Sequence, residues 1–130
     1  ATVNGYREIS LPGELVRARQ ALSDAGVRAE LPSAVDDVDP ELRELFAWTV
    51  REAVTNVVRH AGARTCTVTL QRDRITVSDD GRGRVATSDG NGLEGLRERA
   101  RHAGAVVETG PWNAGHASRP GFALTVREDA

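Results

Sequence analysis

The chain has 130 residues, of which 39% are hydrophobic and 28% charged, a composition that fits one globular domain with its own core. Its formal net charge of −2 argues against a nucleic-acid-binding surface, and every basic residue is arginine, so a lysine-dependent phosphate loop is excluded. No apolar run approaches the roughly 20 residues of a membrane span, and the single Cys66 excludes an internal disulfide.

The sequence contains no methionine, not even at position 1. We therefore expect either a processed protein or a domain excised from a longer one. Because neither a repeat nor a low-complexity tract divides the chain, residues 1–130 are expected to form a single domain.

The first third of the chain predicts strand, helix and strand. Alternation over Tyr6–Ser10 indicates a short edge strand. Pro12 then opens a helical pattern that Gly26 ends. Residues 27–31 alternate as a second strand, which Pro32 breaks.

The middle of the chain predicts a long helix and a hairpin. Asp39 has the character of an N-cap with Pro40 at the first helical position, and the apolar stripe predicts a helix to about His60. The alternating segments Cys66–Leu70 and Arg74–Ser78 then predict two strands joined by a tight turn.

The last third predicts a third helix and two further strands. The helix is expected from about Gly92 to His102, and the strands near residues 105–108 and 122–127. Strands and helices in this order predict a mixed sheet with about three helices on one face, which is an α+β two-layer sandwich.

The long central helix carries polar residues at a spacing of four. Glu52, Asn56 and His60 would lie on one helical face, where the Asn56 amide oxygen suits Mg²⁺ and Glu52 could act as a base. Arg59 and His60 could contact phosphates one turn further on. The alternative is the solvated side of an amphipathic helix.

Two glycine-rich stretches follow. Asp79 and Asp80 run from a strand into Gly81 and Gly83, so a carboxylate at the strand end could accept a hydrogen bond from an exocyclic amine. Glycines within residues 90–95 open a charged helix whose N–H groups could bind an anion. A purine nucleotide with a polyphosphate tail would satisfy both stretches, although each alone could be a turn or a helix start.

These stretches resemble three sequence boxes of the GHKL ATPase superfamily. Residues 51–61 resemble its N box, residues 79–83 its G1 box and residues 90–99 its G2 box. The residues in all three boxes are most similar to those of bacterial sensor histidine kinases of the NarL/DesK-like class. The resemblance covers roughly residues 40–127, and residues 6–31 also look like the start of that catalytic domain.

The resemblance implies a Bergerat fold, with ATP between the helical layer and a short lid. Asn56 would ligate a Mg²⁺ ion that bridges the phosphates, and Glu52 would be the general base or water-orienting group. Asp79 would accept the adenine amino group. The remaining nucleotide-binding positions implied by the boxes are Gly81 and Gly83 at the base, and Arg59, His60, Gly92, Leu93, Gly95 and Leu96 at the phosphates.

The resemblance also implies partners. In the parent kinase, the γ-phosphoryl group of Mg-ATP would pass to a histidine on a separate dimerisation domain, leaving ADP, and that histidine would supply a response regulator. None of His60, His102 and His116 has the setting of a phospho-acceptor, so we expect the isolated chain to be monomeric and not to autophosphorylate. The expected location is the cytoplasm, with the parent kinase anchored in the membrane.

Two features differ from related domains. Gly121 is followed by Phe122, where related domains often have threonine, so a hydroxyl contact to the adenine site is lost. The lid, residues 84–89, is short and should close only to a limited extent. Two other functions stay open: an anti-sigma-factor serine kinase of the same superfamily, which the wording of residues 95–99 disfavours, and a non-catalytic nucleotide-binding docking module.

Overall fold

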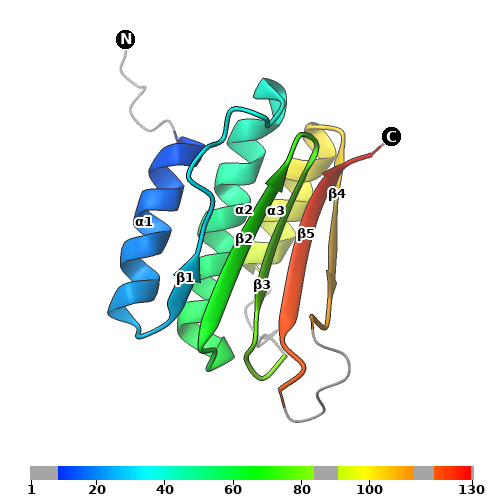
Figure 1. Cartoon of the computed structure of the whole chain (residues 1–130). Helices are drawn as coiled ribbons and strands as arrows, with labels where there is room; N and C mark the ends of the chain where they lie inside the picture. Colours follow the sequence, from blue (N-terminus) through cyan, green and yellow to red (C-terminus); the bar gives the residue numbers. More distant parts are fainter. Residues whose placement is uncertain (1–8, 84–90, 113–118, 130) are drawn as a thin grey trace.

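The computed structural model describes residues 9–83, 91–112 and 119–129, which form two layers. Within these ranges, three α-helices lie against one face of a five-stranded sheet (Figure 1). The predicted α+β two-layer sandwich is confirmed. The predicted lid, residues 84–89, lies outside the described residues.

The sheet is mixed, as predicted: its strand order is β1-β2-β3-β5-β4, β1 runs parallel to β2, and the other neighbours are antiparallel. The elements in chain order are α1 (Leu11–Asp24), β1 (Arg28–Glu30), the 3₁₀ turn η2 (Pro40–Leu42), α2 (Arg43–Asn56), the π-helical turn η3 (Val57–Ala61), β2 (Thr65–Gln71), β3 (Arg74–Asp79), α3 (Asn91–His102), β4 (Ala105–Gly110) and β5 (Phe122–Glu128).

The start of α1 corrects the predicted edge strand at residues 6–10. Residues 6–8 lie outside the described residues, and Ile9 and Ser10 are not in a strand. Ser10 is instead the N-cap of α1, because its hydroxyl accepts a hydrogen bond from the Gly13 N–H at 3.1 Å. The helix ends as predicted before Gly26, whose φ of 76° suits a residue without a side chain.

The start of the central helix also differs from its prediction. Asp39 makes no side-chain capping bond, and residues 40–42 form a 3₁₀ turn before α2 begins at Arg43. The Asp39 carboxylate instead lies 3.2 Å from the Arg72 guanidinium at the tip of the β2–β3 hairpin. The side chain expected to cap the helix therefore ties the helical layer to the sheet.

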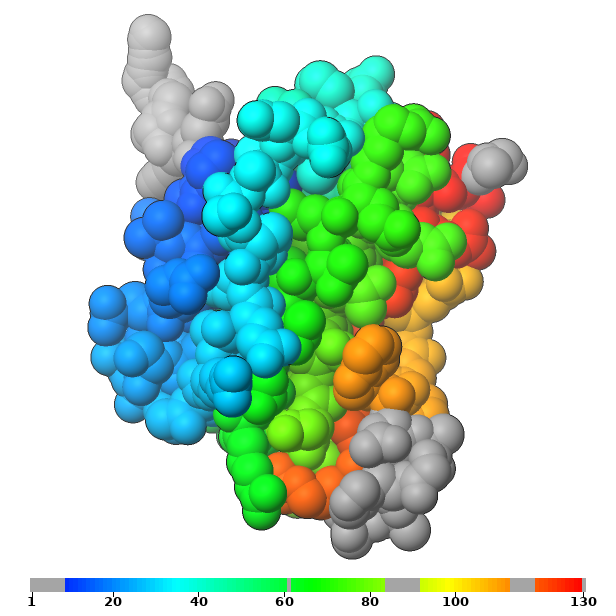
Figure 2. Space-filling view, in the orientation of Figure 1, coloured from blue at the N-terminus to red at the C-terminus, as the bar shows by residue number. Residues whose placement is uncertain are grey.

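The face of the sheet opposite the helices carries polar side chains. Figure 2 views the molecule from this side, with strands near the centre of the picture. Thr67 donates a hydrogen bond to Glu30 at 3.1 Å, and the hydroxyls of Thr76 and Thr125 are 3.2 Å apart. Side chains alternate in this way in a sheet with one solvated face, so the apolar core lies on the other, helix-facing side.

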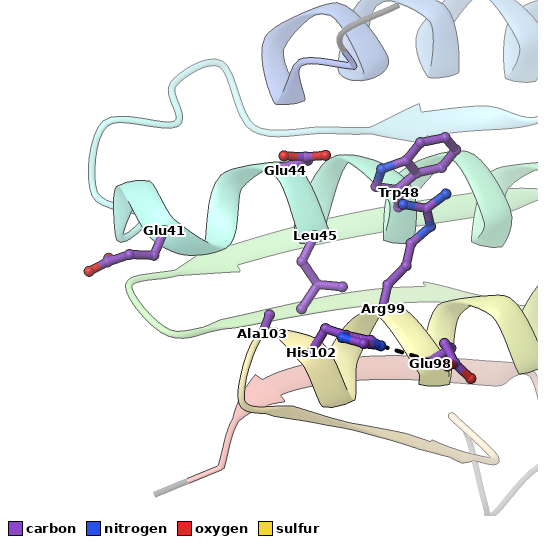
Figure 3. Close-up of a pocket in the computed structure, with 8 residues that line it drawn as sticks. All are labelled: Glu41, Glu44, Leu45, Trp48, Glu98, Arg99, His102 and Ala103. Carbon is purple, nitrogen blue, oxygen red and sulfur yellow. Dashed lines mark ion pairs between the residues drawn. The ribbon is translucent and has the colours of Figure 1, made fainter.

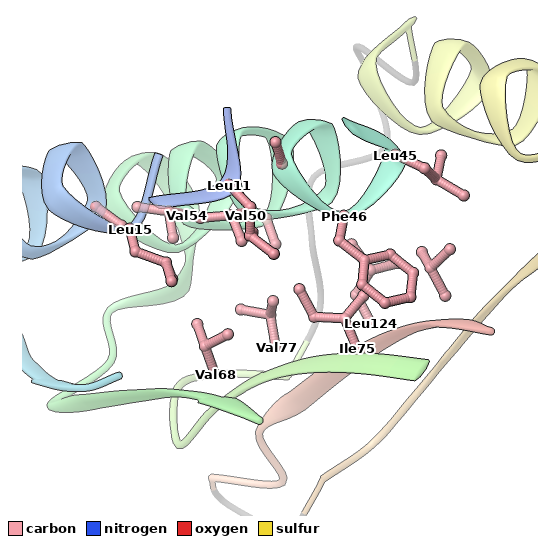
Figure 4. Close-up of a cluster of buried hydrophobic side chains, with 14 of the residues drawn as sticks. Leu11, Leu15, Leu45, Phe46, Val50, Val54, Val68, Ile75, Val77 and Leu124 are labelled. Atoms are coloured by element: carbon pink, nitrogen blue, oxygen red, sulfur yellow. The ribbon is translucent and has the colours of Figure 1, made fainter. Parts of the chain in front are cut away.

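The core fills the space between the helices and the sheet (Figure 4). Phe46 of α2 is fully buried there against strand residues such as Ile75 and Leu124. Each helix buries one face in this way. Among the described residues, no helix is both long and apolar enough to cross a membrane.

Candidate functional site

The central helix carries the predicted polar face, but its last turn is wider than an α-helix. After Asn56 the chain forms a π-helical turn, and Gly62 then takes a left-handed conformation with φ of 61°. Glu52 and Asn56 share one face of the α-helix. The wider π-helical turn rotates His60 away from that face, although His60 is still four residues after Asn56. Single π-helical turns are frequent at functional sites, and a pattern of four-residue spacings does not reveal them.

Asp79 ends β3 on the side of the sheet that faces the helices. It lies on the same face of the strand as Ile75 and Val77, which are buried in the core, and is itself only 4% exposed. One carboxylate oxygen accepts a hydrogen bond from the Gly81 N–H at 2.7 Å. Burial raises the pKa of this carboxyl above 3.8, although the Gly81 hydrogen bond opposes the change.

Two side chains flank Asp79 in the sheet register. Cys66 of β2 lies opposite it on one side, and Phe122 of β5 on the other. Burial, and then the negative charge of Asp79, raises the pKa of the Cys66 thiol to about 12. Phe122 packs against the core, so an aromatic side chain lies beside the carboxylate.

Asp80 has a different environment from that of its neighbour. Its carboxylate accepts hydrogen bonds from the backbone N–H groups of Arg64 at 2.8 Å and Thr65 at 2.9 Å. Burial alone would raise the pKa of Asp80, but these hydrogen bonds outweigh it, and the pKa lies below 3.8. Asp80 therefore anchors the G1 box to the start of β2 and leaves Asp79 to face the helices.

The two carboxylates should respond oppositely to pH. Because the pKa of Asp79 is raised by folding, its ionisation destabilises the fold above the shifted pKa, and this cost disappears below about pH 3.8. Asp79→Asn should therefore raise the melting temperature at pH 7 and have little effect near pH 3.8.

The pKa of Asp80 is lowered by folding, so its ionised carboxylate stabilises the fold above pH 3.8, and this stabilisation is lost as the pH falls further. Asp80→Asn should therefore lower the melting temperature at pH 7.

Thermal melts of both variants at pH 7 and pH 4, followed by circular dichroism, measure this difference. The substituted amide can still accept the Gly81 N–H in place of the Asp79 carboxylate, so the variant changes the charge and not the turn. Shifts of the two melting temperatures in the same direction at pH 7 would contradict the assignment.

Close backbone contacts explain two of the glycines beside Asp79. Gly121 has φ of 69°, and a methyl group there would collide with the Asp79 carbonyl oxygen. Gly83 has φ of 92°, and a methyl group there would collide with the ring of Pro120. The Gly121 N–H also donates to the Gly81 carbonyl oxygen at 3.1 Å, so the G1 box and the segment before β5 are joined through their backbones. This close approach requires glycine at positions 83 and 121.

Two arginines join the G1 box and β5 to the end of the central helix. The Arg82 guanidinium donates to the His60 carbonyl oxygen at 2.7 Å. The Arg119 guanidinium donates to the Gly62 carbonyl oxygen at 3.0 Å. Both cations lie at the C-terminal end of the helix, where unpaired carbonyl groups favour positive charge. Neither role was predicted, because nothing near these arginines in the sequence indicates these acceptors.

The N box and the G2 box meet where α3 begins. A methyl group on Gly92 would overlap the Glu52 carboxylate, so the helix start lies directly against this side chain. Of the other predicted phosphate-binding positions, Leu96 is buried in the core and Leu93 packs against it. Their side chains are structural, and only the N–H group of Leu93 lies in the first turn of α3, where helical N–H groups lack partners. A methyl group on Gly95 would meet no neighbouring atom.

The oxygen donors available fit a magnesium ion held largely by phosphates. Asn56 is half-buried one turn after Glu52, and Arg59 is exposed beyond it. No group of three or more His, Cys, Asp or Glu side chains in the described ranges could hold a metal alone. Magnesium keeps several waters and takes one or two protein ligands with substrate phosphates, which is compatible with this donor set.

A separate pocket of about 320 Å³ lies between α2 and α3 (Figure 3). Leu45, Trp48 and Arg99 are among its lining residues. None of the predicted site residues lines it; these lie at the end of α2, the end of β3 and the start of α3. The pocket is therefore distinct from the candidate nucleotide site.

Comparisons with known proteins bear on the family. No protein-family model matches the chain. Sensor histidine kinase DesK of Bacillus subtilis is 36% identical over 110 residues, which are 78% of this chain and 30% of the relative. Sensor histidine kinase YvfT of the same organism is 31% identical over 104 residues, 75% of this chain and 28% of the relative. The chain thus spans less than a third of the length of either relative.

Among the solved structures with a similar fold, one aligns over nearly the whole length of both chains. The ATP binding domain of PrrB from Mycobacterium tuberculosis aligns with a TM-score of 0.59 at 18% sequence identity, covering 92% of this chain and 93% of that one. At this identity the similarity shows the fold. The layered fold is thus shared with a known ATP binding domain. The two sequence relatives show that the chain belongs to the sensor histidine kinases.

Proposed function

We propose that this domain binds Mg-ATP and acts as the catalytic part of a longer sensor histidine kinase. The observation that carries the proposal is the meeting of the three boxes. Gly92 of the G2 box lies against Glu52 of the N box, and Arg82 of the G1 box binds the His60 carbonyl oxygen. A nucleotide with its base at one box and its phosphates at the others would use all of them.

Asp79 would read the adenine. A buried carboxylate with a raised pKa lacks solvation, so an exocyclic amino group that donates a hydrogen bond to it recovers part of that cost. Gly81 and Gly83 would let the backbone approach the base. Phe122 would border the base with an aromatic ring where related domains have a hydroxyl.

The phosphates would lie at the start of α3. Backbone N–H groups in the first turn of a helix have no partner within the helix and attract anions. Asn56 would hold Mg²⁺, which neutralises phosphate charge when bound. The other groups proposed for the phosphates are Arg59 and His60, together with the backbone N–H groups of Gly92 and Leu93. The N–H groups of Gly95 and Leu96 lie beyond the first turn of α3 and are used within the helix.

The reaction would transfer the γ-phosphoryl group to a histidine on the dimerisation domain, and that histidine would then supply a response regulator. The imidazole nitrogen forms a bond to the γ-phosphorus, the bond to the bridging oxygen breaks, and ADP leaves. Glu52 would orient the imidazole or accept its proton. Contact with Gly92 holds the Glu52 carboxylate at the helix start, where the phosphates are proposed to lie.

The proposed setting is the cytoplasm, where ATP is supplied, with this domain attached to a membrane-anchored parent and monomeric by itself. The two relatives are both sensor histidine kinases, so the anti-sigma-factor serine kinase is not favoured. In a purified sample given radiolabelled ATP, the isolated chain should not label itself; strong labelling on histidine would contradict this proposal.

Magnesium dependence tests the role of Asn56. The native domain should bind a fluorescent ATP analogue more tightly with Mg²⁺ than with EDTA. Asn56→Ala should lose this difference, so that its two dissociation constants agree within about twofold. Thr55→Ala, an exposed neighbour on the same helix, is the matched control and should behave as the native domain.

The same titration separates the remaining alternative. If the native domain showed no saturable nucleotide binding, only a docking role that does not use nucleotide would stand. If Asn56→Ala kept the full effect of Mg²⁺, the metal would be held by other groups.

A further inference from the structure

Besides the core packing of Leu96 and Ala100, two contacts join α3 to α2. One is the contact of Gly92 with Glu52 described above. The other is the Arg99 guanidinium, which lies 3.7 Å from the centre of the Trp48 ring (Figure 3). Trp48 precedes Glu52 by one turn, and Arg99 follows Gly92 by about two turns, so a rigid α3 links the two contacts.

The Trp48 ring is also linked to the first helix. The Arg51 guanidinium lies 5.0 Å from the ring centre, and its Nη2 atom is 2.7 Å from a carboxylate oxygen of Glu14. Glu14 belongs to α1 and is only 4% exposed. A chain of contacts thus runs across all three helices, from Glu14 through Arg51 and Trp48 to Arg99.

The indole N–H does not explain why a tryptophan occupies this position. Nε1 of Trp48 is buried and has no hydrogen-bond acceptor in the described part of the chain. Burying an unpaired N–H is unfavourable, so the indole N–H does not contribute to the stability of this arrangement. Its aromatic face is the part that makes specific contacts, because guanidinium groups are attracted to that face.

We propose that Trp48 and Arg99 are positioning residues for the phosphate end of the nucleotide. Their stacking holds α3 so that its first turn stays against Glu52, which keeps the backbone N–H groups of Gly92 and Leu93 in place. This inference rests on the proposed binding of ATP. Loss of the Trp48–Arg99 contact should therefore weaken binding of ligands that carry phosphates and have almost no effect on binding of the base.

Arg99→Gln tests this, with Arg101→Gln as the matched control. Both remove one positive charge from α3, but Arg101 pairs with Glu98 on its own helix. Competition against a fluorescent ATP analogue gives dissociation constants for ATP and adenosine. Arg99→Gln should weaken ATP binding by roughly two- to fivefold, as expected for loss of a cation–π contact at an exposed arginine, and leave adenosine binding unchanged. Arg99→Lys should restore most of the loss.

Amide hydrogen exchange of the nucleotide-free domain gives a second, independent result. Arg99→Gln should speed exchange over residues 93–96, whereas Arg101→Gln should not. Equal losses for ATP and adenosine, or unchanged exchange over residues 93–96, would overturn the positioning role. If the native domain did not bind ATP, the proposed function would fail, and the exchange result would still decide whether the stack holds the helix.

Discussion

Asp79→Asn should weaken ATP binding by roughly 10- to 100-fold, the range expected when a hydrogen bond to a buried charged group is lost. The carboxylate only accepts hydrogen bonds, which matches the donor amino group of adenine, whereas an amide presents a donor of its own. The carboxylate is also buried and turned toward the helical layer, so no water competes freely for it. Calorimetric titration of ATP into both proteins measures the difference.

The discriminating measurement compares ATP with inosine triphosphate, which has an oxygen where adenine has the amino group. The native domain should prefer ATP, and Asp79→Asn should reduce that preference. Asp80→Asn is the control, because Asp80 binds the backbone of Arg64 and Thr65 and should not affect the ratio. If Asp79→Asn lowered the affinities for both nucleotides equally, Asp79 would hold the pocket in shape and would not read the base.

The sequence alone predicted most of the elements because local signals mark them. Alternation fixed the two strands of the hairpin to within one residue at each end, and Gly26 marked the end of α1. The three boxes also identified the candidate site residues, because residue type and spacing can be read from the sequence alone. The structure shows the N, G1 and G2 boxes joined by contacts, which the sequence could only suggest.

The missed features depend on residues far apart in the chain. Glu14 and Arg51 are 37 positions apart, and Arg119 and Gly62 are 57 apart, so no local pattern predicts either contact. The edge strand expected at residues 6–10 failed at Ser10, because a serine hydroxyl that can cap a helix outweighed a weak alternation. The π-helical turn after Asn56 has no distinguishing residue type.

Gly121→Ala should lower both stability and nucleotide affinity. Two costs add: a left-handed φ of 69° is unfavourable for alanine by about 1–2 kcal/mol, and the new methyl group collides with the Asp79 carbonyl oxygen, an overpacking cost of about 1–3 kcal/mol. The backbone at Asp79 must then shift, and the carboxylate that is proposed to read adenine moves with it. Urea denaturation and ATP titration of the same variant measure both effects.

Gly104→Ala separates these two costs. Gly104 has a similar φ of 72°, but a methyl group there would have no atom within 4 Å. This control should therefore lose only the conformational part, about 1–2 kcal/mol, and should bind ATP as the native domain does. The difference between the two variants is the free energy of the close approach between β5 and the end of β3. Equal destabilisation of both, with ATP binding intact, would mean that this approach has no part in shaping the nucleotide site.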